Sequence, residues 1–424
     1  MINYKKLISA LTILTFAGSV LAQTSTNSPY TRYGFGMLSD QTFGTSKGMG
    51  TIGYGLRNNS QINVSNPASY SAIDSLTFLF DAGITLQNTN FKEGSVQTNA
   101  KNSSFDYLAM QFRLFRNMGM TVGILPFSTV GYNLYNTTQI DTDEDGNEIN
   151  SLNSYVGDGG LNQIFVGFGY KAFKGLSVGA NFSYLYGDIT HSVTTSFNTT
   201  SSSSSVRKDK ISVNDFKADF GLQYSYDISK KNRINVGLTY SLGHDMNSTG
   251  YKYIQKYNSS SSLPLTQTVD TIKNAFNLPH SFGAGFTYIY DNKLTIGADY
   301  TLQKWSSSKF YNEKNYFSNL SKIAVGAEYI PNNLSHNYLK RVRYRVGGYY
   351  SEPYTKVDGK DGAKEYGLTA GFGFPLFQSK SMLNISGQYI KISPKVKGML
   401  EENYLKINIG LTFNERWFMK YKVD

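Results

Sequence analysis

The 424-residue sequence contains no cysteine, only nine prolines and only four histidines. A chain without cysteine cannot rely on disulfides, so its secondary-structure network must hold it together. The histidines lack the spacing of metal ligands, and no Ser-His-Asp or Cys-His arrangement can be argued from the sequence. We therefore predict no metal site, no cofactor and no catalytic activity.

Long apolar runs are also missing. Beyond the N-terminus no stretch approaches the ~18 apolar residues of a transmembrane helix. Residues 1–22 resemble a secretory signal, because Lys5 and Lys6 precede an apolar stretch at residues 7–16, and we expect cleavage after Ala22. This apolar stretch is too short to favour a membrane anchor. An exported chain without transmembrane helices is either a soluble periplasmic or secreted protein or a membrane barrel.

Acidic residues are fewer than basic residues, 30 against 41. The formal net charge is +11, and it falls to +9 when Lys5 and Lys6 are removed with the signal. Such a charge is compatible with contact to anionic headgroups or acidic ligands, but scattered lysines on a solvated surface are the simpler explanation. No nucleic-acid-binding motif accompanies the charge, so we expect no nucleic acid as partner.

The sequence is rich in tyrosine (33), phenylalanine (27) and glycine (40), which recur in short alternating segments. In residues 176–187, apolar side chains alternate with Ser177, Gly179, Asn181 and Ser183. Alternation places the two sets on opposite faces of a strand. Large apolar side chains facing lipid and small polar ones facing a lumen are typical of a transmembrane β-barrel.

From residue 75 onward the segmentation predicts an all-β, antiparallel barrel of about fourteen strands spanning residues 75–424. The expected strands begin near Ser75, Ser104, Met118, Leu161, Leu176, Phe216, Arg233, His280, Leu294, Ser321, Tyr344, Tyr366, Leu383 and Tyr404. An even number of strands leaves both chain ends in the periplasm.

The expected connections alternate between short turns and longer loops, as in outer-membrane barrels. Residues 136–160, 190–214 and 247–279 form the longest predicted external loops. Residues 136–160 and 247–279 offer a surface for a protein partner, which keeps a second function open: a barrel that docks a secreted substrate or a partner subunit.

Residues 23–74 lack clean alternation and are rich in glycine, including Gly48, Gly50 and Gly53. These glycines match a dinucleotide-binding fingerprint by letters, but no strand, helix or βαβ unit surrounds them, so tight turns with close backbone packing are the better interpretation. The segment is too small for an independent domain without disulfides or metal. We expect it to fold as a plug, or hatch, inside the barrel.

An acidic stretch in the first long loop resembles the start of a calcium-binding loop. Asp141, Asp143 and Asp145 have the right spacing, but the twelfth position, where a bidentate glutamate is needed, is Leu152. We favour an acidic external turn, with weak calcium binding as the alternative.

Pro126 lies inside the third predicted strand, in the stretch from Gly123 through Phe127. Proline donates no ladder hydrogen bond and is tolerated at bulges or edges. Because a closed barrel has no edge, Pro126 indicates a local break in the wall. One interpretation is a harmless kink near a strand end; the other is a side opening through which an apolar molecule leaves the lumen.

Several short motifs resemble those of the FadL/TodX family of outer-membrane transporters for hydrophobic compounds. Asn66-Pro67-Ala68 after the glycine-rich stretch is similar to the family's hatch signature. Leu278-Pro279-His280 and Trp305-Ser306 resemble a strand start and a strand end. The stretch from Arg345 to Tyr350, followed by Pro353, resembles the family's arginine-glycine-tyrosine strand.

The resemblance implies a fourteen-strand barrel with an internal hatch and passive diffusion of long-chain fatty acids or similar apolar molecules. It also implies lateral release at a kink in the third strand, where Pro126 falls. We therefore expect a monomer in the bacterial outer membrane, surrounded by outer-membrane lipid and binding a hydrophobic small molecule. A related branch of the family serves as a carrier in protein secretion, and the motifs do not separate the two branches.

Overall fold

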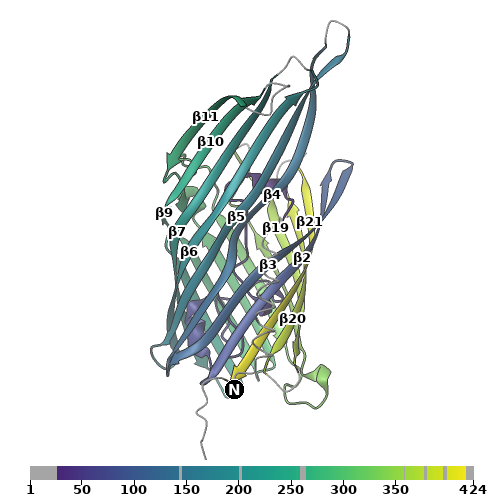
Figure 1. The fold of residues 1–424 in the computed structure, drawn as a ribbon. Coiled ribbons are helices and arrows are strands. Elements are labelled where there is room, and N and C mark those ends of the chain that lie inside the picture. Colours follow the sequence, from purple (N-terminus) through teal and green to yellow (C-terminus); the bar gives the residue numbers. More distant parts are fainter. Residues whose placement is uncertain are drawn as a thin grey trace, which may run out of the picture.

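The computed structural model describes residues 26–142, 146–199, 203–257, 264–357, 359–376, 380–394 and 399–416. In these residues, fourteen antiparallel strands close into a barrel, as predicted (Figure 1). Closure comes from β2, which pairs with the last strand, β21. The wall strands in order are β2 (Thr77–Glu93), β3 (Val96–Phe115), β4 (Met118–Thr142), β5 (Glu148–Lys171), β6 (Leu176–Phe197), β7 (Ser204–Asp227), β8 (Asn232–Ser241), β13 (Ser281–Tyr290), β14 (Leu294–Gln303), β15 (Leu320–Tyr329), β16 (Arg343–Ser351), β19 (Lys364–Pro375), β20 (Met382–Ser393) and β21 (Glu401–Arg416).

The alternating sequence produces a wall with two different faces. On β6 and β7, Phe182 and Phe216 point outward, and Phe216 is 72% exposed, whereas Asn181 on the inner face is 3% exposed. Large apolar side chains outside and small polar ones inside suit a lipid exterior and a filled lumen. Among the described residues, no helix is long and apolar enough to cross a membrane.

The strands differ greatly in length. β4, β5 and β7 have 24 or 25 residues, whereas β13, β14 and β15 have ten each. A hairpin of β10 (Ser248–Tyr257) and β11 (Pro264–Lys273) continues the sheet from the upper part of β7. These strands form a projection that rises above the rest of the barrel in Figure 1.

The prediction of long loops was therefore wrong at residues 136–160, 190–214 and 247–279, which are largely strand. The expected starts of β5 and β7 were correspondingly too late by twelve or thirteen residues, and that of β3 was too late by eight. Above the membrane neither face needs to meet lipid, so the alternation that marks a lipid-facing strand disappears. The ladder of backbone hydrogen bonds continues regardless of side-chain polarity.

The N-terminal segment, residues 26–74, lies within the barrel and precedes β2. It contains η1 (Pro29–Arg32), β1 (Met37–Leu38), α2 (Gly44–Lys47) and η2 (Pro67–Ala72). Its backbone touches the inner wall where the wall carries glycine: an added Cβ on Gly326 would meet the Met49 carbonyl oxygen at 2.2 Å. Smaller elements outside the wall ladder are β9 (His244–Asp245), β12 (Asn277–Leu278), η3 (Trp305–Ser307), η4 (Tyr338–Lys340), β17 (Lys356–Val357) and β18 (Lys360–Asp361).

An aromatic cluster fills the upper end of the lumen. Phe35 of the N-terminal segment is fully buried at its centre, and its ring lies 5.9 Å from those of both Phe276 and Trp305. Phe310 and Phe317 complete the contacts around Phe35. Edge-to-face aromatic contacts add to the stability gained from burial alone, so this cluster anchors the segment at the upper end of the lumen.

Candidate functional site: a break in the wall beside an internal cavity

The ladder between β3 and β4 stops partway up the wall. The two strands pair from Phe115 and Met118 to Leu108 and Ile124, and above this level β3 pairs only with β2 among the described residues. Immediately above Ile124, the β4–β5 register shifts between Pro126 and Ser128. The β4 edge that faces β3 is therefore unpaired with β3 from this level upward.

The predicted residues of the kink lie at this point. Pro126 and Phe127 form the irregular step in β4, and Gly123 is the partner of Ala109 in the last rungs of the ladder. A Cβ on Gly123 would meet the Leu108 carbonyl oxygen at 2.7 Å, so glycine allows β3 and β4 to approach closely.

The irregularity continues into the next two strands as a crease. Gly159, Gly160 and Gly187 have φ values of +106°, +149° and +148°, which disfavour residues with a side chain. Thr129 pairs with Gly160, and Leu161 pairs with Gly187, so these residues lie at the level of the Pro126 step. Sequence reasoning missed the crease, although Gly159-Gly160 inside a predicted loop was its signal.

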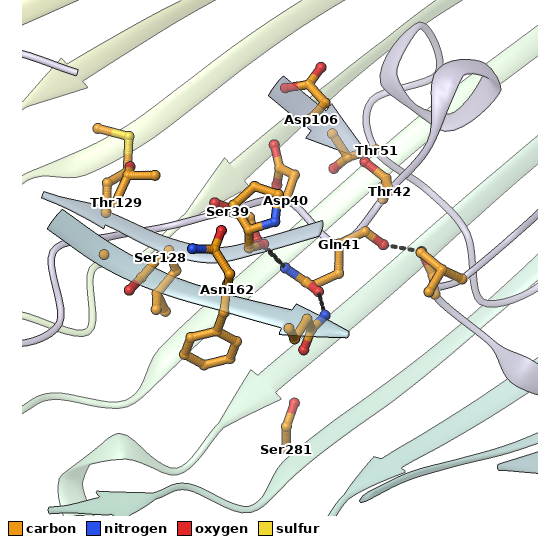
Figure 2. A pocket seen from close by; sticks show the side chains of 18 of the residues that line it. Ser39, Asp40, Gln41, Thr42, Thr51, Asp106, Ser128, Thr129, Asn162 and Ser281 are labelled. Atoms are coloured by element: carbon orange, nitrogen blue, oxygen red, sulfur yellow. Dashed lines mark hydrogen bonds between the residues drawn. The ribbon is translucent and has the colours of Figure 1, made fainter. Parts of the chain in front are cut away.

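Residues 31–41 of the N-terminal segment, which we call the strap, cover the free edge of β4. Met37 pairs with Thr129 and Leu38 with Ser128, and the Ser39 amide donates to the Phe127 carbonyl over 2.9 Å. Figure 2 shows Ser39, Asp40 and Gln41 beside Ser128 and Thr129.

Two further strap side chains bind the same edge. The Gln41 Nε2 donates to the Pro126 carbonyl over 3.2 Å, and the Thr31 hydroxyl accepts from the Gly131 amide over 3.2 Å. Buried backbone groups need partners, and the strap supplies them where β3 does not.

A cavity of about 850 Å³ lies against the strap inside the barrel. Its lining mixes apolar side chains, such as Phe127, Phe165 and Trp305, with charged ones. Ion pairs join Lys47 to Asp106 and Lys322 to Asp40 at 2.7 Å each. Lys217 and Asp219 form a third pair, and Asp299, Glu365 and Lys406 also line the cavity. The cavity can therefore hold a molecule with both an apolar and a polar part.

The predicted hatch residues lie deeper in the lumen, away from the strap contacts. Gly50 has a φ of +65°, and its amide donates to the Thr369 hydroxyl over 2.8 Å. Gly53 and Tyr54 donate their amides to one carboxylate oxygen of Asp299, at 2.6 and 2.8 Å. These contacts fasten the segment to β14 and β19.

The Asn66-Pro67-Ala68 motif begins η2. The Asn66 Oδ1 accepts from the Ala68 amide over 3.1 Å, and its Nδ2 donates to the carbonyls of Tyr54 and Leu222. Asparagine at this position thus caps a short helix and fixes it to β7. Pro67 of this motif and Pro126 both line the cavity, so the structure brings the two predicted features to one space.

A buried charge network underlies Gly48. Arg345, whose side chain is 1% exposed, pairs with Glu328 at 2.7 Å, and Arg343 pairs with the same carboxylate at 3.1 Å. An added Cβ on Gly48 would touch Arg345 at 3.4 Å. The N-terminal segment therefore rests directly on this network.

We expect Glu328→Ala to lower the free energy of unfolding by about 3–5 kcal/mol, because it leaves the buried Arg345 charge without its partner. The free energy of unfolding is measured by titration with urea, in which the heat-dependent gel mobility of the barrel reports the folded fraction. Lys293→Ala, which breaks the exposed pair with Asp291, is the matched control and should change little. Equal midpoints for the two variants would contradict the prediction.

Two sequence predictions fall wholly or partly outside the described residues. The expected cleavage site after Ala22 is one, and the acidic loop, with Asp143 and Asp145, is the other. Within the described residues, no group of three or more His, Asp or Glu side chains is placed to hold a metal ion.

A family profile described as BamG matches residues 1–424. No curated protein gives a significant match. Among solved structures, the CymD monoaromatic hydrocarbon channel has a TM-score of 0.58 at 14% identity, covering 91% of this chain and 99% of that one. The Ralstonia pickettii toluene transporter TbuX has a TM-score of 0.59 at 14% identity, covering 89% and 99%. A Pseudomonas aeruginosa FadL homologue has 0.59 at 12% identity, covering 90% and 100%.

The structural matches confirm the predicted FadL/TodX barrel fold. Because their sequence identity to this chain is only 12–14%, these structures establish the fold alone. The profile, in contrast, matches the chain from its first residue to its last. The chain belongs to the BamG family.

Proposed function

We propose that the protein is an outer-membrane channel that takes up hydrophobic small molecules by passive diffusion and releases them sideways into the membrane. The observation that carries the proposal is the end of the β3–β4 ladder beside the cavity. Two proteins of similar fold are described as a monoaromatic hydrocarbon channel and a toluene transporter. These descriptions support a hydrophobic cargo.

The geometry supports the following path. A molecule enters from the upper end, reaches the cavity, and leaves between β3 and β4 when the strap withdraws from Ser128 and Thr129. A saccharide-coated outer leaflet resists apolar solutes, so a path that ends inside the hydrocarbon layer avoids both this barrier and the aqueous periplasm. We propose that residues 23–74 act as the hatch that closes the lumen, and that long-chain fatty acids are among the cargo.

Two variants test the path. Pro126→Ala supplies the missing amide, which lets β4 pair further, and we expect uptake of a labelled fatty acid to fall several-fold. Deletion of residues 23–59 removes the strap, and uptake should become fast and unselective. Heat-dependent gel mobility establishes that each barrel is folded. Unchanged uptake in both folded variants rules the path out.

A second function is favoured by one specific observation, the projection formed by β4–β7, β10 and β11. A wall that rises above the barrel on one side offers a large surface for docking a secreted polypeptide or a partner subunit. Gentle purification followed by identification of what accompanies the barrel separates the two functions: lipid-like molecules support the channel, and a stoichiometric polypeptide supports docking.

A further inference from the structure

The strap carries a single acidic residue, Asp40, and its carboxylate lies on the cavity side. Asp40 pairs with Lys322 of β15 at 2.7 Å, and a third of its side chain remains exposed. Two residues earlier, Leu38 pairs with Ser128 of β4. The strap is thus held on one side by the backbone of β4 and on the other by a charge from across the lumen.

Two more lysines act on the same carboxylate. Burial acts to raise the pKa of Asp40, but Lys322, Lys406 and Lys47 together hold it below its usual value. Lys406 comes from β21, and its ammonium lies 5.5 Å from the centre of the Tyr404 ring. Lys47 comes from α2 and pairs with Asp106. Lys322 is therefore the direct partner of Asp40, and Lys406, which lines the same cavity, is a second cation in its surroundings.

The surroundings of this anion are suited to an amphiphile. Met37, Leu38 and Phe127 line the same cavity as Asp40, Lys322 and Lys406. A molecule with an anionic head and an apolar chain could place the head on the lysines and the chain against the apolar strap residues. A carboxylate or phosphate forms the same charge-assisted hydrogen bonds to lysine that Asp40 forms.

We propose that Lys322 and Lys406 form a binding site for the anionic head of a single-chain amphiphile, that Asp40 occupies this site as an internal substitute, and that its displacement releases the strap from β4. The proposal rests on the proposed channel function and names its cargo class. A ligand shifts a conformational equilibrium only through differential affinity for the two states. A wholly apolar molecule has nothing to exchange for Asp40 on Lys322 and cannot drive this release.

Release can be observed with a spin label at Ser39→Cys, because the natural chain has no competing cysteine. The purified full-length barrel is mixed with a long-chain fatty acid, the alcohol of the same chain, or inorganic phosphate. We expect only the fatty acid to make the label mobile. Release by the alcohol to the same extent, or by phosphate alone, overturns the amphiphile assignment.

Two variants make the test more specific because they should change the affinity for the fatty acid in opposite directions. Both Asp40→Asn and Lys322→Met should free the strap without ligand, since each breaks the same ion pair. Asp40→Asn, however, removes the competitor and should tighten fatty-acid binding, whereas Lys322→Met removes the site and should weaken it about tenfold. Equal shifts in the same direction overturn the proposal, because they indicate a structural role only.

Asp74→Asn is the matched control, since Asp74 belongs to the same segment and pairs with Lys380 at 3.6 Å outside the cavity. It should leave both label mobility and binding unchanged. The failure of the inference is separable from failure of the channel: uptake of the fatty acid and the alcohol at equal rates, with a strap that both molecules make equally mobile, refutes the Asp40 switch alone. Absence of uptake for both molecules refutes the channel.

Discussion

A disulfide between Leu38→Cys and Ser128→Cys is expected to stop uptake of labelled hydrophobic molecules, and a reductant is expected to restore it. The two positions are paired antiparallel neighbours in β1 and β4, so their Cα atoms lie at a separation that a disulfide can bridge. The bond fixes the strap on the free edge of β4. Uptake should fall roughly tenfold or more, because the open state is removed.

The matched control is a disulfide between Ile254→Cys and Thr268→Cys, which are paired in β10 and β11, away from the wall break. This bond should form equally well and leave uptake unchanged. Uptake that continues through the locked strap would place the exit elsewhere, for example through the lower end of the lumen.

Replacing Gly50 by alanine is expected to convert the closed barrel into one with steady single-channel conductance. The φ of +65° at Gly50 costs a residue with a side chain about 1–2 kcal/mol. The added Cβ would also meet the Val325 carbonyl oxygen at 2.3 Å. Because the wall cannot yield, the N-terminal segment must leave its position, and the lumen opens to ions.

Gly94→Ala separates the backbone strain of a positive φ from the collision of the added Cβ. Gly94 has a similar φ of +58°, but nothing lies within 4 Å of an added Cβ. This variant carries the backbone strain without the collision, so its conductance should match that of the natural chain. If both variants conduct alike, the close packing of Gly50 against β15 is not what keeps the lumen closed.

Alternation was sufficient to predict the barrel, because a strand between lipid and lumen must repeat its polarity every two residues. The starts of β4, β6 and β14 were predicted at the residues where they begin. The projection was missed for the same physical reason. Residues 190–199 and 203–214 are mostly polar and lack the regular alternation of the lower wall, and only the partner strands, which a sequence does not identify, keep them extended.

The residues of the candidate site also fall into those that could be predicted from the sequence and those that could not. Pro126 could be singled out from one strand, because its effect on a ladder is local. Asp40 and Lys322 lie 282 residues apart, and neither stands out in a sequence with 41 basic and 30 acidic residues. Only closure of the wall brings β15 opposite the strap. Asp299 was visible as an inward-facing polar residue, but its hydrogen bonds to the amides of Gly53 and Tyr54 depend on the fold of the segment.

The pairing of β2 with β21 restricts how this molecule can be assembled. The first wall strand keeps an unsatisfied edge until the last one arrives, so completion waits for the far end of the polypeptide. Residues 26–74 precede that first strand and must already be enclosed when the final ladder forms, since later entry would require the separation of paired strands. Biogenesis is therefore a wrapping of the sheet around its own N-terminal region.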